Sequence, residues 1–280
     1  MLKHTFCHSP RLSVTDEQSL WEEGYRTWKD IVWSKKLPLK YKQNQALLDT
    51  CRKSAFHLGN SDASFFYNTL PTKEHWRLFK DFREKTAFFD IETTGLDRNK
   101  NHITTIVLYD GLKLRHYVYK ENLEDFCKDI EDYKLIVSYN GKSFDAPFIR
   151  ENLKIPLNQP HIDLRYVLNS LGYRGGLKSC ERQLNINRRG LEEVDGFMAI
   201  LLWERYIKYG DEKALETLLA YNALDVINLE VLMIIAFNQK TAETPFKHLR
   251  IPVPTAPKMT LIPDNEIIQK IKGIDSYGRL

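Results

Sequence analysis

The pattern of hydrophobic and polar residues divides the chain into a helical beginning and a later part that contains strands. Over residues 1–80 the pattern indicates helices. Thr15–Gln18 has the form of a capping box, Gly24 ends the helix that follows, and Thr27 begins another. We therefore expect a small helical N-terminal region.

The layout of this region resembles a helix-hairpin-helix unit, in which a glycine-rich hairpin brings backbone N–H groups close to a DNA phosphate. The hairpin position is Pro10–Ser13, which contains no glycine and offers Arg11 instead. Contact with phosphate and simple packing of helices both stay open for this loop.

From residue 86 onward, short runs of β-branched and aromatic residues alternate with polar turns, which is typical of strands. The runs Ala87–Glu92, Ile103–Tyr109 and Leu112–Tyr119 predict three sequential antiparallel strands. The acidic stretch Asn122–Asp132 is expected to be helical, and the apolar run Leu135–Tyr139 fits a buried parallel strand. Residues 81–240 are therefore predicted to form an α/β domain with a mixed sheet flanked by helices. Its later helical patterns begin at Asp163, Gly176, Asp195 and Asp211.

The last segment, residues 241–280, contains five prolines and predicts an extended tail that packs on the core, with one short helix over 266–272. A hydrophobic content of 42% and a charged content of 28% indicate a globular protein. No consecutive apolar run approaches the roughly 18 residues of a membrane span, and residues 1–12 lack the apolar segment of a secretory signal. The four cysteines are scattered, as is typical of reduced thiols. We expect a cytoplasmic protein with no membrane association and no obligate protein partner.

The net charge of +4 is unevenly distributed. Residues 1–80 contain 13 Lys and Arg against 8 Asp and Glu, whereas residues 81–280 contain 28 against 29. A basic region beside an acidic one suits a protein that holds phosphates with one part and a metal with the other.

Asp90 and Glu92 are two residues apart on a predicted strand, so both side chains leave the same face while Ile91 points into the core. The strand runs directly into the turn Thr93–Leu96, and such a rigid pair of carboxylates can bind a metal with little reorganisation. An exposed strand end is the alternative. The same tripeptide at Asp129–Glu131 lies in an acidic helical stretch and is interpreted as a solvated face.

Asp145 follows the predicted parallel strand through a turn and stands in the first turn of a helix, where an acid is favourable without any function. The strand would neighbour the strand of Asp90, however, which brings the acids together. Phe144 could then pack against a base or sugar, and Asn140 could donate to a substrate.

Tyr221 and Asp225 are four residues apart on a largely apolar helix and therefore share a face. An acid on such a helix needs a cation or hydrogen bonds, so a salt-bridged aspartate and a core tyrosine are the alternative to a site. Jointly, the carboxylates of the three segments form an oxygen-rich set that suits two hard divalent cations.

Taken together, the segments resemble the DEDDy group of 3′→5′ exonucleases, which have a ribonuclease H-like core. Position 220 is alanine rather than the histidine of the related DEDDh group. A wider stretch, most of residues 70–240, is similar to a family of predicted prokaryotic exonucleases with this core. The matching motifs are D-x-E at Asp90 and Glu92, N-x-x-x-F-D at Asn140–Asp145, and Y-x-x-x-D at Tyr221–Asp225.

The resemblance implies a ribonuclease H-like, mixed five-stranded sheet of three antiparallel and further parallel strands, and phosphodiester hydrolysis with two Mg²⁺ or Mn²⁺ ions. It implies that Tyr221 orients the attacking water and that Leu96 and Phe144 contact the terminal nucleotide. The implied metal ligands are Asp90, Glu92, Asp145 and Asp225, and the further substrate contacts are Thr93 and Asn140.

A glycine-rich segment, Arg174–Lys178, could bring backbone N–H groups and the Lys178 ammonium near a phosphate at a helix N-terminus. A glycine turn that merely caps a helix is the alternative.

The expected function is a metal-dependent 3′→5′ exonuclease that releases nucleoside monophosphates from the 3′ ends of single strands. DNA is favoured and RNA stays open, because two-metal phosphate chemistry does not depend on the sugar. A non-catalytic nucleic-acid-binding protein and an endonuclease on the same fold are the alternatives.

Overall fold

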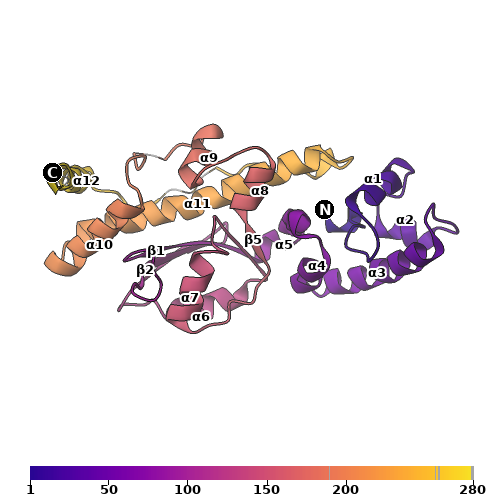
Figure 1. The fold of residues 1–280 in the computed structure, drawn as a ribbon, viewed down its shortest axis with the longest axis horizontal. Helices are drawn as coiled ribbons and strands as arrows, with labels where there is room; N and C mark the ends of the chain where they lie inside the picture. Colours follow the sequence, from indigo (N-terminus) through magenta and orange to yellow (C-terminus); the bar gives the residue numbers. More distant parts are fainter. Residues whose placement is uncertain (189, 256, 258, 279–280) are drawn as a thin grey trace.

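A mixed five-stranded sheet with the strand order β3-β2-β1-β4-β5 forms the centre of the protein (Figure 1). The computed structural model describes residues 1–188, 190–255, 257 and 259–278. The strands are β1 (Thr86–Thr93), β2 (Ile103–Tyr109), β3 (Leu114–Val118), β4 (Leu135–Ser138) and β5 (His161–Asp163).

Strand β1 lies in the middle of the sheet and joins its two halves. It pairs with β2 in antiparallel register, Asp90 opposite Val107, and with β4 in parallel register, Phe88 opposite Val137. Strands β2 and β3 are antiparallel, and β4 and β5 are parallel. The predicted ribonuclease H-like sheet is therefore confirmed.

Helices cover both faces of the sheet, and the alternation of side chains along β1 explains why. Phe89 and Ile91 point to the face packed against α6 (Asp125–Asp129) and α7 (Asp145–Leu153). Phe88 points to the opposite face, which α11 (Glu212–Ala242) crosses (Figure 1). Asp90 and Glu92 follow Phe88 on that same face. The other helices between β3 and α11 are η4 (Ile130–Asp132), α8 (Leu164–Ser170), α9 (Leu177–Gln183) and α10 (Gly196–Tyr209).

Helix α11 is the central helix of the core. By length and composition it could cross a membrane, but 89% of its most apolar window is buried inside the protein. It packs against β1, β2 and α10. Its apolar surface is therefore used within the fold.

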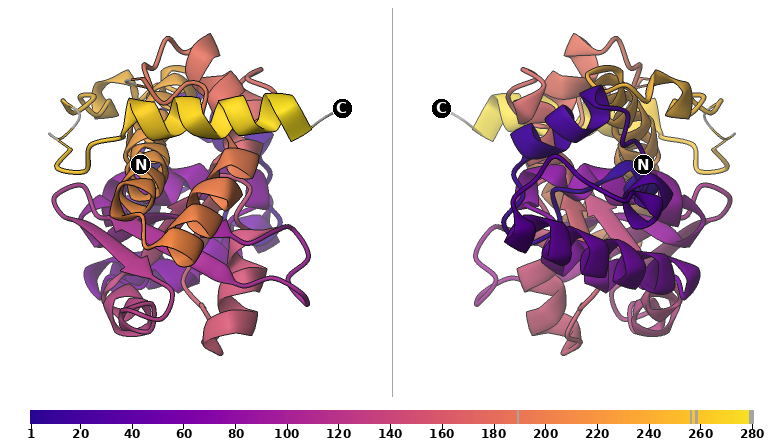
Figure 2. Two further views of the ribbon diagram at one scale, coloured as in Figure 1. Left: turned by 90° about the vertical axis from the view of Figure 1, so that its left-hand side faces the viewer. Right: turned by 90° about the vertical axis from the view of Figure 1, so that its right-hand side faces the viewer.

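The N-terminal region is helical and gathers at one end of the molecule (Figures 1 and 2). Its packing is continuous with the rest of the core, because the Phe79 ring lies 6.1 Å from that of Phe88 and 6.3 Å from that of Phe237. A buried ion pair between Arg77 and Glu17 (2.7 Å) joins its two ends. The elements are η1 (Leu2–His4), α1 (Val14–Glu22), α2 (Trp28–Trp33), α3 (Tyr41–Gly59), α4 (Ala63–Thr69), η2 (Thr72–Arg77), α5 (Leu78–Phe82) and η3 (Arg83–Lys85).

Two details of this region differ from the sequence-based prediction. The cap of α1 is Ser13, whose hydroxyl accepts from the Asp16 N–H at 3.1 Å, so the capping box starts two residues before Thr15. The loop Pro10–Ser13 follows the short 3₁₀ helix η1 and precedes α1. Because no α-helix precedes this loop among the described residues, the two-helix layout of a helix-hairpin-helix unit is not formed there.

The C-terminal segment contains more helix than expected. A 3₁₀ turn, η5, spans Lys247–Leu249, and α12 spans Asn265–Gly278. Ile267, Ile268 and Ile271 are buried in the cluster that includes residues of α10 and α11. Helix α12 thus lies across the ends of these two helices (Figure 2).

Candidate active site

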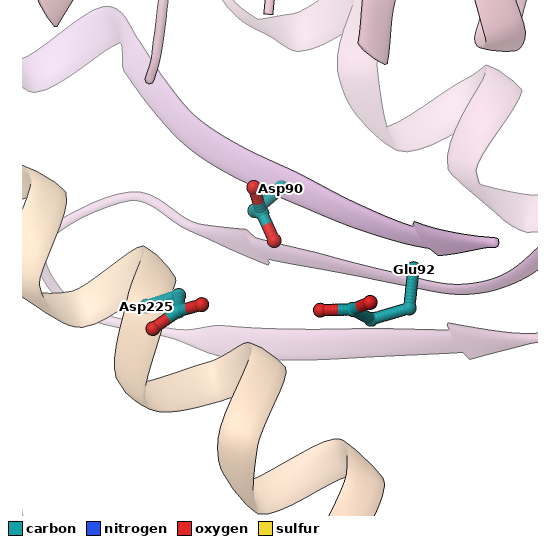
Figure 3. A group of neighbouring side chains, drawn as sticks. All are labelled: Asp90, Glu92 and Asp225. Atoms are coloured by element: carbon teal, nitrogen blue, oxygen red, sulfur yellow. The ribbon is translucent and has the colours of Figure 1, made fainter. Parts of the chain in front are cut away.

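Three carboxylates converge between β1 and α11. Asp90 and Glu92 leave the same face of β1, and Asp225 faces them from α11 (Figure 3). One ligand oxygen from each lies within 4.8 Å of the others. This arrangement arises from two regular elements, because the strand period places both acids of β1 on the face that α11 crosses.

Asp145 lies beside this group. It is the first residue of α7, and its Oδ1 accepts from the backbone N–H of Ile91 at 3.2 Å, so it borders the strand between the two acids of β1. Its ligand oxygen is not among the three that lie within 4.8 Å. Gly141 makes the approach of this turn feasible, because an added Cβ would lie 2.1 Å from the Ser138 Oγ.

Burial raises the pKa of all four acids, and the neighbouring carboxylates of the site add to this effect for Asp90 and Glu92. Burial and then the neighbouring carboxylates raise the pKa of Asp90 and Glu92 well above the usual range. Burial raises the pKa of Asp145 to about 7 and that of Asp225 to about 6. Such a set of close carboxylates is unfavourable when ionised unless a cation is present. Because every donor is a carboxylate oxygen, the site fits hard divalent ions such as Mg²⁺ or Mn²⁺.

Arg188, which the sequence analysis does not predict, is part of the candidate site. Its guanidinium is buried and pairs with both Asp225 and Glu181. Glu181 is itself buried and accepts a further hydrogen bond from the Asn228 amide at 2.7 Å. The side chain of Asp225 is therefore fixed from behind by a buried ionic network, whose arginine lies in a loop with no recognisable motif.

Asn222 is a second residue of the site that the sequence analysis does not predict. Its Nδ2 donates to Asp90 Oδ2 at 2.8 Å, while its Oδ1 accepts from the Thr105 hydroxyl at 3.2 Å. The amide thus links β1, β2 and α11 and orients the carboxylate of Asp90. Its spacing of three residues from Asp225 places both on one helix face, which is a signal that the sequence did contain.

The Tyr221 side chain is buried, with 6% exposed, and lies one helical turn before Asp225. The Lys178 ammonium and the Arg188 guanidinium lie 5.3 and 5.5 Å from its ring centre. Burial, followed by the nearby carboxylates, raises the pKa of its phenol far above 10. The hydroxyl therefore remains protonated and can donate a hydrogen bond.

The residues predicted to contact the substrate differ in their exposure and in their hydrogen bonds. Leu96 is 85% exposed and shares with Phe144 a hollow of about 260 Å³. The Thr93 hydroxyl donates to the Gly95 carbonyl at 2.8 Å and so holds the turn. The Asn140 Oδ1 accepts from Arg165 at 2.6 Å. Lys178 donates to the carbonyl oxygens of residues 192 and 194, which draws its ammonium toward backbone acceptors.

A family model described as RNase_H superfamily matches residues 87–236, which is more than half of the chain. This chain belongs to the RNase_H superfamily. RNase H-like proteins of this superfamily are nucleases that use divalent metals, in agreement with the acidic cluster.

This RNase_H superfamily member is also similar to the uncharacterized protein YprB of Bacillus subtilis (strain 168), with 28% identity over 165 residues. The similar part covers 51% of this chain and 39% of that protein. Among solved structures, a family B DNA polymerase from the archaeon Pyrobaculum calidifontis aligns over 59% of this chain and 26% of its own length. That alignment has 16% identity and a TM-score of 0.43.

Divalent metal is expected to raise the melting temperature of this protein. Binding to the folded state stabilises it by about 2.7 kcal/mol when the free ion is at 100 times its Kd. Differential scanning fluorimetry in Mn²⁺, Mg²⁺ and chelator measures the shift. Glu92→Gln should lose most of it, whereas Glu131→Gln, in the other Asp-Ile-Glu tripeptide, should keep it. Equal shifts in both variants would place the metal elsewhere.

Proposed function

We propose that this protein is a metal-dependent 3′→5′ exonuclease that hydrolyses single-stranded nucleic acid to nucleoside monophosphates, with DNA as the preferred substrate. The observation that carries the proposal is the convergence of Asp90, Glu92 and Asp225 at one point. Asp145 lies beside them and Tyr221 lies one turn before Asp225, which supports assigning these five residues to the DEDDy pattern.

In this proposal Asp90, Glu92 and Asp225 hold the metal, with Asp145 as a further ligand. Bound divalent ions supply a Lewis acid that lowers the pKa of water and offsets charge on the phosphate. The protein keeps its own side chains in place for this chemistry. Asn222 fixes one carboxylate, and Arg188 fixes another.

Tyr221 serves as a donor that orients the attacking water. Its raised pKa suits this task, because a protonated phenol can donate where an ionised one would add a further negative charge. Replacing it with phenylalanine removes the hydroxyl alone and should therefore be milder than replacing an acid.

The hollow between Leu96 and Phe144 supports specificity for a chain end. The hollow has a mainly polar lining, in which the exposed Leu96 and the ring of Phe144 offer the apolar contacts on which a terminal base can pack. The 3′-terminal nucleotide would occupy this hollow, which lies at the turn after β1 and at the start of α7.

The test is degradation of a 5′-labelled single-stranded 20-mer. In Mg²⁺ or Mn²⁺ we expect a ladder that shortens from the 3′ end, and in chelator an intact strand. Equal degradation of a strand with a blocked 3′ end, or cleavage of a circular single strand, would contradict the proposed polarity. Matched DNA and RNA strands compare the two sugars in the same assay.

A further inference from the structure

A second cavity borders the start of the loop between β4 and α7. It has a volume of about 640 Å³ and is formed by the end of β4, helix α8 and the loop before α9. Its polar lining includes Asn140, Asn169 and the side chains of Arg165 and Arg174. No described carboxylate lines it, and neither arginine has an acidic partner among the described residues.

The aromatic part of the lining is held by its hydroxyl groups. Tyr139 donates to the Gly175 carbonyl at 2.5 Å, and Tyr173 accepts from the Gln239 amide at 2.8 Å. Both side chains are half-buried, so each hydroxyl is anchored while part of the side chain borders the cavity. Rigid aromatic side chains beside guanidinium groups that pair with no described carboxylate are a combination that binds bases and phosphates of single strands.

Two segments of the chain carry residues of both the cavity and the candidate active site. Asn140 lines the cavity and stands five residues before Asp145, in the loop that leads into α7. Leu177 lines it as well, and the next residue, Lys178, places its ammonium 5.3 Å from the ring centre of Tyr221. The hollow of Leu96 and Phe144 lies at the opposite end of that same loop, because it is lined from Ser143 onward.

We propose that this cavity binds a nucleotide of the single strand upstream of the cleaved bond. The inference rests on the proposed function and assigns the two cavities complementary tasks. The hollow of Leu96 and Phe144 takes the 3′-terminal nucleotide, and the cavity of Arg165 and Arg174 takes the sugar-phosphate chain that leads to it. The two guanidinium groups pair with phosphate oxygens, and Tyr139 or Tyr173 packs against a base.

The test compares a double variant, Arg165→Ala with Arg174→Ala, on two substrates. Thymidine 5′-(p-nitrophenyl phosphate) carries the terminal nucleotide without an upstream strand, and its hydrolysis should be unchanged. For a single-stranded 20-mer we expect KM to rise about 10- to 100-fold, the size of one or two lost charge-assisted contacts. Both residues are exposed, and the change removes a hydrogen bond from Arg165 to the Asn140 side chain on the surface, so the fold should stay intact.

Binding without hydrolysis provides a second readout. In Ca²⁺, the slope of log affinity against log salt for a labelled 20-mer should fall by about 1.4 in the double variant, since each phosphate contact on a single strand contributes about 0.7. Matched deoxythymidine and uridine 20-mers test both sugars. The control is Arg52→Ala with Arg182→Ala, two exposed arginines outside the cavity, which should change neither KM nor the salt slope.

The outcomes separate this inference from the proposed function. If the wild type degrades the 20-mer and the double variant keeps its KM and salt slope, the cavity assignment is wrong while the exonuclease proposal stands. If the wild type hydrolyses neither substrate, the exonuclease proposal fails. A reduced salt slope in the double variant would still support strand binding in the cavity.

Discussion

Asp90→Asn is expected to abolish hydrolysis, with a loss of at least about 10²–10³-fold, the scale of a single electrostatic stabiliser. Asp90 lies at the centre of the acidic group, since burial and then Asp145, Asp225 and Glu92 raise its pKa. Removing its charge removes a metal ligand. It also relieves repulsion among the remaining acids, so the metal-free variant should be at least as stable as the wild type.

The measurement is the rate of release of nucleotides from the labelled 20-mer, together with the midpoint of urea unfolding in chelator. Asp129→Asn is the matched control. Asp129 begins the other Asp-Ile-Glu tripeptide, on α6, where it accepts from the Tyr117 hydroxyl at 2.6 Å, a bond that asparagine can also accept. Full activity in Asp90→Asn would refute the assignment of the site, whereas equal losses in both variants would indicate a general effect.

Arg188→Met is expected to destabilise the protein by about 3–5 kcal/mol, the usual effect of removing one partner from a buried ion pair. Among the described residues, the substitution leaves the buried Glu181 with the Asn228 amide as its side-chain hydrogen-bond partner, and it deprives Asp225 of its ion pair with Arg188. Urea unfolding followed by tryptophan fluorescence measures the loss.

The double variant Glu181→Gln with Arg188→Met distinguishes the ion pair from simple loss of packing. The introduced glutamine can still accept from Asn228 and carries no charge, so the double variant should recover part of the lost stability. If it is destabilised by the sum of the two single changes, the pair has no coupling energy and the network is merely a packing feature. Both variants are compared in chelator, so that metal binding does not contribute.

The sheet and most helices could be predicted because their signals are local. The helices expected from Asp195 and Asp211 begin one residue after those caps, and the run Ile103–Tyr109 is strand β2 as predicted. Strand β5 was not located, because its three residues His161–Asp163 are too few to show a period of two. The sequence favours a start of α1 at Thr15 because Gln18 can complete a capping box with it, but in the structure Asp16 forms the box with Ser13 instead.

The candidate site could be predicted only in part, because some of its contacts are local and others are tertiary. Asp90 and Glu92 share a strand face, and the strand period predicts their proximity. The proximity of Asp225 to these two acids depends on where α11 crosses the sheet, and the hydrophobic pattern of the sequence does not determine that position. Arg188 reaches the site from a loop, so its contact with Asp225 is a tertiary contact without a sequence spacing.

The placement of three acids on β1 and α11 has a consequence for heat inactivation. These two elements are among the most deeply buried of the chain, so their relative position should persist until cooperative melting of the whole protein. Loss of enzymatic turnover on warming should then coincide with loss of helical circular dichroism. At intermediate temperatures we expect neither a partly unfolded form that is still active nor a native form that is inactive.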